Sequence, residues 1–216
     1  MKNIAWMLMF AIYTPFLIPP AAAVEEAALY AEDAPEGSAF VRVFNAYSAQ
    51  TLENIDLGGK VIKTLDPLES SPYVFLPAGG HAVRVEGKNQ QVTMREGEFY
   101  TVIAGSQFPL TVIRDEAFNN RRKALVSLYN VVSKEKLDLK TADGGIPIIE
   151  DVGFLGNKTR EINPVRLSVE ALAGDTPLGQ SKPVNLQWGK VFSLFACGES
   201  GQPSLVWVEN KIDTTL

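Results

Sequence analysis

The chain contains 216 residues, with 20 lysines and arginines against 25 aspartates and glutamates, and a formal net charge of −5. Apolar residues make up 46% and charged residues 21%, a globular balance that excludes a disordered acidic tail, a collagen-like chain and a coiled coil. A single cysteine, Cys197, and a single histidine, His81, exclude an intramolecular disulfide and a Cys/His zinc site. The acidic pI, near 5.0, argues against a nucleic-acid partner, because phosphate binding requires clustered lysines and arginines.

Residues 1–23 are typical of an export signal. Lys2 gives a positive start, an uninterrupted apolar run extends from Ile4 to Tyr13, and Ala21-Ala22-Ala23 supplies the small residues of a cleavage site. No cysteine lies near this site, which excludes a lipoprotein. We predict cleavage after Ala23, which leaves a mature chain of 24–216 without a transmembrane span; the alternative is an uncleaved anchor helix.

The sequence after the signal alternates with a period of two, as half-buried antiparallel strands do. Phe40, Arg42 and Phe44 lie on one face of the first such segment, and Val41 and Val43 lie on the other. Turn signals recur about every ten residues, which favours a sandwich or a barrel. The strands expected in the first half are 38–45, 52–57, 61–65, 73–76, 81–86, 90–94, 99–104 and 110–114.

Segments of the first half recur in the same order in the second half. Ser38–Asn45 and Lys123–Asn130 share the pattern x-Ala-apolar-Val-polar-apolar-aromatic-Asn, and Val92–Ile103 resembles Val184–Phe195. We interpret these matches as an internal duplication. The strands expected in the second copy are 124–130, 136–141, 147–152, 159–162, 165–172, 183–187, 191–196 and 204–209.

These patterns predict an all-β fold of two tandem antiparallel β-sandwich modules. No window indicates a long amphipathic helix, which disfavours parallel βαβ folds. The expected first module is 24–116, the linker is 117–123 and the second module is 124–216.

The expected linker is polar and dense in charge, with one isolated aromatic residue. One interpretation is a solvated linker with Phe118 tucked against one module. The other is a docking segment in which Phe118 is an anchor and Arg121, Arg122 and Lys123 meet an acidic partner, with Phe118, Arg121 and Arg122 as the candidate docking residues.

The sequence indicates no catalytic residue, no cofactor-binding loop and no set of metal ligands. His81 follows two glycines at a turn, and Gly174-Asp175-Thr176 predicts a hairpin turn rather than an esterase motif. Cys197 lies in an apolar run and is expected to be buried. Tyr73 with Phe75, Trp188 and Trp207 are candidate sugar platforms, with burial in the core as the alternative.

Several stretches resemble the AlgF family, exported accessory proteins for O-acetylation of alginate. Those that carry the resemblance are 28–30, 34–42, 75–77, 123–126, 139–144, 160–165 and 206–208, including LKTADG and REINPV in the second half. The resemblance implies a periplasmic protein of two β-sandwich modules that contains no cofactor. It also implies an adaptor for biofilm exopolysaccharide acetylation, with SGNH-type acetyltransferases and a membrane acyl-transporter as partners. The alternative is a protein that itself carries or transfers the acetyl group, or that binds the polyuronate.

Overall fold

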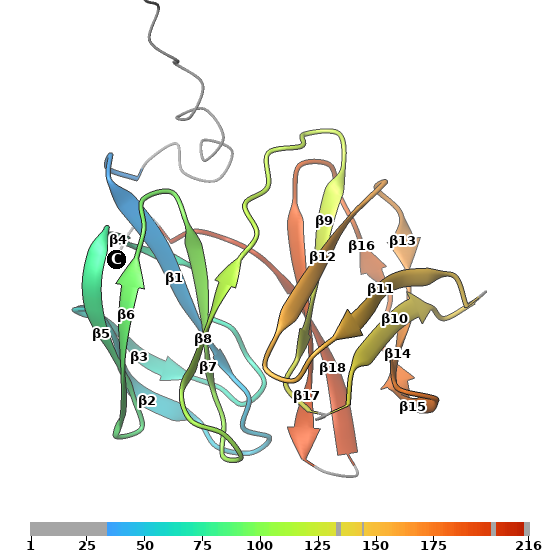
Figure 1. The fold of residues 1–216 in the computed structure, drawn as a ribbon, viewed down its shortest axis with the longest axis horizontal. Helices are drawn as coiled ribbons and strands as arrows, with labels where there is room; N and C mark the ends of the chain where they lie inside the picture. Colours follow the sequence, from blue (N-terminus) through green and yellow to red (C-terminus); the bar gives the residue numbers. More distant parts are fainter. Residues whose placement is uncertain (1–33, 133–134, 144, 200–201, 214–216) are drawn as a thin grey trace, which may run out of the picture.

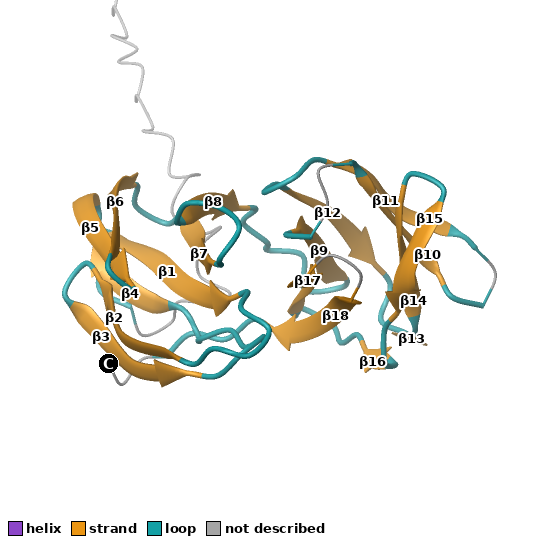
Figure 2. Ribbon diagram, turned by 90° about the horizontal axis from the view of Figure 1, so that it is seen from below, coloured by secondary structure: helices purple, strands orange, loops and turns teal. Residues whose placement is uncertain are grey.

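A computed structural model describes residues 34–132, 135–143, 145–199 and 202–213 (Figure 1). The predicted signal peptide and its cleavage site after Ala23 lie outside these residues. The described part of the chain is built from β-strands and contains no helix, and the strands form two bodies that lie side by side (Figure 2). None of these residues therefore forms a helix that could span a bilayer.

The first module is a sandwich of two four-stranded sheets. One sheet has the order β4-β1-β7-β8 and the other the order β3-β2-β5-β6. The strands are β1 (Ser38–Asn45), β2 (Leu52–Leu57), β3 (Lys60–Leu65), β4 (Val74–Pro77), β5 (Gly79–Val85), β6 (Lys88–Met94), β7 (Phe99–Ala104) and β8 (Thr111–Asp115).

The second module repeats this strand order. Its sheets are β12-β9-β17-β18 and β11-β10-β14-β15, with an added two-stranded sheet, β13-β16. The strands are β9 (Ala124–Asn130), β10 (Leu137–Thr141), β11 (Pro147–Val152), β12 (Asn157–Ile162), β13 (Arg166–Leu167), β14 (Val169–Ala173), β15 (Thr176–Gln180), β16 (Val184–Asn185), β17 (Val191–Glu199) and β18 (Gln202–Glu209). Two modules with one strand order agree with the predicted duplication.

Alternation along the strands fills the core of each sandwich. In β1, Ala39, Val41 and Val43 face the first core together with Leu52, Ile55 and other apolar residues. In β9, the corresponding side chains at Ala124, Val126 and Leu128 face the second core. One pairing in each module departs from the antiparallel expectation: β1 pairs with β7, and β9 with β17, in parallel.

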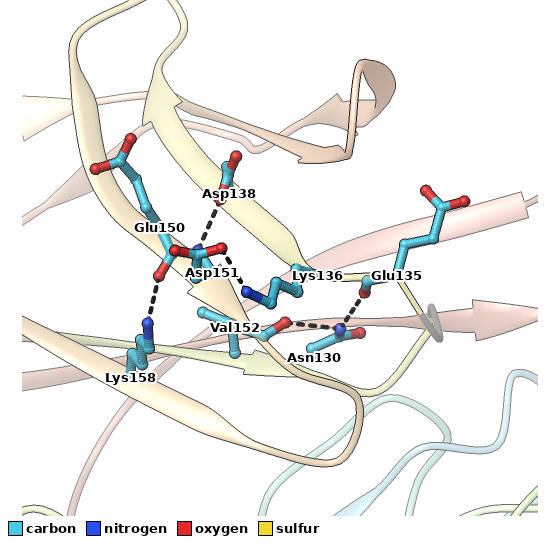
Figure 3. A network of polar contacts seen from close by, with 8 residues as sticks. All are labelled: Asn130, Glu135, Lys136, Asp138, Glu150, Asp151, Val152 and Lys158. Atoms are coloured by element: carbon cyan, nitrogen blue, oxygen red, sulfur yellow. Dashed lines mark hydrogen bonds and ion pairs between the residues drawn. The ribbon is translucent and has the colours of Figure 1, made fainter.

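The asparagine that ends the repeated motif has the same role in both modules. Asn45 Nδ2 donates to three backbone oxygens, those of Gln50, Leu65 and Asp66, at 2.8 to 3.1 Å. Asn130 Nδ2 donates to the backbone oxygens of Glu135 and Val152 at 3.0 and 3.1 Å (Figure 3). Each amide thus ties the end of the central strand to the loop that follows it and to the end of the second strand after it, β3 or β11.

A surface network lies beside Asn130 (Figure 3). Lys136 Nζ lies 3.0 Å from Asp151 Oδ1, and the Asp151 N–H donates to Asp138 Oδ1 at 2.8 Å. The hydrogen bond and charge of Lys136 lower the pKa of Asp151. These contacts fasten β10 to β11 at the point where their register shifts.

The C-terminal segment returns from the second module to the first. Tyr73 N donates to Lys211 O, and Asp213 N donates to Tyr73 O, both at 2.8 Å. Ile212 thereby forms a parallel bridge with Tyr73, next to the edge strand β4. Residues 211–213, which the sequence analysis assigns to the second module, lie against the first.

Candidate functional site at the junction of the modules

The outer faces of sheets β4-β1-β7-β8 and β12-β9-β17-β18 cover each other. Phe44 in β1 stacks on Phe195 in β17, with ring centroids 3.8 Å apart and planes 4° from parallel. Tyr129 in β9 stacks on the same Phe195 ring at 4.4 Å. As a result every residue of β1 is buried, whereas alternation alone predicts a half-buried strand.

Arg42 lies at the centre of this junction and is only 1% exposed. Its Nε donates to Thr101 Oγ1 at 2.9 Å within the first module. Its Nη1 donates to Asn210 Oδ1 at 2.7 Å, and its Nη2 donates to Ser193 Oγ at 2.7 Å and to Tyr129 OH at 3.3 Å. One guanidinium therefore joins β1 to β9, β17 and the segment after β18.

Asp115, at the end of β8, supplies the negative charge of the same network. Its Oδ2 accepts from Thr101 at 2.6 Å and from Tyr73 at 2.7 Å, and its Oδ1 accepts from Tyr129 at 2.6 Å. Burial raises the pKa of Tyr73 and of Tyr129, so both hydroxyls keep the protons that they donate. Thr101 and Tyr129 each contact both charged groups and link Arg42 to Asp115.

The guanidinium of Arg42 stays charged in this setting. Burial acts to lower its pKa, but Tyr73, Tyr129 and Asp115 act to raise it, and the balance is a raised pKa. Arg42 also lies over the Tyr73 ring, 4.6 Å from its centroid. Three of the guanidinium's hydrogen bonds cross to the second module, so an alignment of the two sheets that broke them would leave buried donors unpaired.

The cavities next to the network are small. One of about 20 Å³, room for about one water molecule, is lined by residues that include Asp115, Phe118 and Asn210. Another, of about 10 Å³, lies between Tyr47 and Val131. Neither has the several hundred Å³ of a typical small-molecule site.

A wider, open groove of about 500 Å³ lies on the second module. Its lining includes Asp143, Arg166, Ser168 and Gln180, and it contains no aromatic side chain. In the described part of the chain no three His, Cys, Asp or Glu residues are grouped as metal ligands. The groove therefore presents polar groups but no aromatic ring on which a sugar could stack.

The structure places the three residues of the predicted docking segment in different environments. Phe118 is 6% exposed and packs against Leu125 and Val191 of the second module, which is the tucked arrangement that the sequence left open. Arg121 and Arg122 are exposed. The docking role of this segment stays a prediction, and in this conformation it depends on the two arginines.

The other residues considered for catalysis or sugar binding lie in different parts of the molecule and do not form one site. The half-buried ring of His81 donates from Nε2 to Pro77 O at 2.7 Å. Cys197 is buried, and burial raises its pKa to about 12. Of the proposed sugar platforms, Tyr73 is buried and Trp207 packs against the second core, whereas Trp188 is 71% exposed.

Sequence reasoning missed Arg42, Asp115 and Asn210 as a set. The available signal was an arginine placed between two phenylalanines on one strand face, which is an unusual place for a solvated charge. Nothing local to Arg42 shows that Asn210 would bind it or that Asp115 would share its network.

Comparisons with known proteins place the chain among similar sequences over nearly its whole length. The family profile described as "Alginate O-acetyl transferase AlgF" matches residues 17–193. The alginate biosynthesis protein AlgF of Pseudomonas putida is 36% identical over 187 residues, covering 87% of this chain and 86% of that protein. The AlgF protein of Pseudomonas aeruginosa is 35% identical over 192 residues, covering 89% and 88%. A solved structure of the C-terminal domain of AlgF from P. aeruginosa is 39% identical, with a TM-score of 0.38, and covers 41% of this chain and 99% of that domain.

Proposed function

Because this chain belongs to the AlgF family, whose curated members are alginate biosynthesis proteins, we propose that it is an exported, non-catalytic adaptor of alginate O-acetylation. Family membership gives it a role in alginate biosynthesis and acetylation. In the proposal it lies in the periplasm, where it docks SGNH-type acetyltransferases; the membrane acyl-transporter is a second candidate partner.

The observation that carries the proposal is how the buried polar groups are used. The polar side chains around Arg42 and Asp115 bind each other, some within the first module and others across the junction. Acyl transfer requires a nucleophile beside a base, and an open position where the acyl carbon can lie. The cavity next to this network has room for about one water molecule, so the network supports a rigid scaffold better than a reaction site.

The two residues most suited to acetyl chemistry are poorly placed for it. His81 is on β5 of the first module, and Cys197 is on β17 of the second. The thiolate that would attack an acetyl donor is disfavoured by the raised pKa of Cys197. Neither residue supports the alternative of an acetyl carrier or transferase.

The test separates docking from chemistry. The chain from Val24 onward is titrated into a purified exported SGNH-type acetyltransferase of its own cell, and separately into mannuronate oligomers. In parallel, a deletion strain is complemented with the wild type, His81→Ala or Cys197→Ala, and the acetyl content of the polymer is measured. We expect binding to the acetyltransferase, no heat with the oligomers and normal acetylation with both variants. Loss of acetylation in His81→Ala, with folding and partner binding intact, would replace the adaptor with a catalytic protein.

A further inference from the structure

Two loops of the second module meet at one end and form an exposed surface. Trp188 lies in the turn before β17, and Arg121 and Arg122 lie in the segment before β9; Figure 1 shows these two segments at the same end of the module. Gly189 N donates to Lys123 O at 2.8 Å, which holds the two segments together. We call Trp188, Arg121, Arg122 and Val165 the Trp188 surface.

Val165 joins this surface through a backbone contact. Leu186 N, two residues before Trp188, donates to Val165 O at 3.0 Å. Trp188 is 71% exposed and Val165 is 45% exposed, and they are two of the four large apolar side chains that are exposed in the described residues. The backbone segments that carry these two exposed apolar side chains are therefore hydrogen-bonded to each other.

The backbone that carries the two arginines is held in place. Arg122 N donates to Asn120 Oδ1 at 3.0 Å, and Asn120 Nδ2 donates to Glu161 Oε2 at 2.7 Å. Within the described residues neither Arg121 nor Arg122 has an ion-pair partner, so both guanidinium groups are available to a ligand. The surface is locally basic on a chain whose formal net charge is −5.

The shape and composition of the surface favour a protein ligand. None of the three cavities described above is lined by Trp188, Arg121 or Arg122, whereas small ligands and sugars are bound in concave sites. Tryptophan and arginine are the residues that most often dominate protein interfaces, and charged groups at the rim select partners of opposite charge.

We propose that the Trp188 surface docks an acidic face of a partner protein, with the Trp188 indole in an apolar recess and Arg121 and Arg122 paired with carboxylates. The proposal rests on the adaptor function, and its partner is the exported acetyltransferase. Docking there involves neither the first module nor the buried junction around Arg42.

The experiment measures the affinity of the chain from Val24 onward for the purified acetyltransferase. The test variants are Trp188→Ala and the double variant Arg121→Glu with Arg122→Glu. The matched controls are Ile146→Ala, which removes an apolar side chain that is 64% exposed on another loop, and Lys63→Glu, which reverses an exposed charge on β3. Circular dichroism checks that every variant remains folded.

The proposal expects a loss of affinity of about 30-fold or more in each test variant, the size of a hot-spot residue, and unchanged affinity in both controls. The double variant should also reduce the dependence of the affinity on salt concentration. If the wild type binds and all variants bind equally well, the Trp188 surface is overturned while the adaptor function stands. If the wild type does not bind, the adaptor function itself fails. If mannuronate oligomers bind the wild type but not the test variants, the surface takes the polymer rather than a protein.

Discussion

Replacing Arg42 by methionine should uncouple the two modules. Arg42 donates to Asn210 and Ser193 at 2.7 Å, and to Tyr129 at 3.3 Å, all beyond the first module. Each hydrogen bond from a charged group contributes about 1.5–3 kcal/mol, but the cost of desolvating the guanidinium offsets part of the sum. The substitution also removes the opposite charge near Asp115. We expect a loss in the free energy of unfolding of about 3–5 kcal/mol, the usual cost of breaking a buried charged pair.

Urea unfolding of the chain from Val24 onward checks this expectation with two signals. Trp188 and Trp207, the tryptophans of that chain, lie in the second module, so fluorescence reports that module alone. Far-UV circular dichroism reports both modules. The two curves should coincide in the wild type and separate in Arg42→Met, because only coupled modules unfold in one transition.

The matched control is Arg84→Met. Arg84 pairs with Asp56 at 2.7 Å on the surface, and its side chain is 58% exposed. Losing a surface ion pair changes stability by no more than about 1 kcal/mol. If Arg42→Met loses no more unfolding free energy than Arg84→Met, and its fluorescence and circular dichroism curves still coincide, the buried network does not hold the modules together.

Three further predictions concern other residues. Asn45→Ala and Asn130→Ala should each lower the free energy of unfolding by about 2–3 kcal/mol, because each amide binds several backbone oxygens. Amide-exchange protection should fall mainly in the module that carries the substitution, and an equal loss of protection in both modules would contradict this. Phe118→Ala should cost about 3–5 kcal/mol in thermal unfolding, as expected for a buried ring, and an unchanged Tm would show that the ring is not packed. Cys197 should resist a thiol reagent at pH 8 until urea is added. Burial raises the pKa of Cys197 from 9.0 to about 12, so between these pH values the thiol is protonated in the folded state and ionised in the unfolded state. The free energy of unfolding should therefore fall from pH 9 to pH 12, and it should fall less steeply in Cys197→Ala.

Much of the fold could be predicted because each strand carries its own alternating pattern. Strands 38–45, 52–57, 99–104, 124–130 and 147–152 have the predicted bounds. Strand β15 was missed, since Pro177 and Gly179 inside Thr176–Gln180 are residues that strands disfavour. The parallel pairing of β1 with β7 was also missed, because strand direction depends on the path of the chain and not on local pattern.

The junction could be predicted only in part. Alternation shows that Arg42 shares a face with Phe40 and Phe44, but it does not show that a second module covers that face. Contacts between Arg42 and Asn210 join residues at opposite ends of the chain, and no local signal reports them. Phe118 illustrates the converse: an isolated aromatic in a polar segment has the same local pattern whether it is buried or awaits a partner.

The C-terminal bridge between Tyr73 and Ile212 bears on how the protein is made. Ile212 follows the second module in the chain, so this bridge to the first module can close only once both modules are in place. A newly made first module must therefore persist with the face of Phe40, Arg42 and Phe44 open to water. Arg42 in the middle of that face is hydrated until the modules meet, so the cost of removing its water is met only when the second module supplies Tyr129, Ser193 and Asn210 as partners.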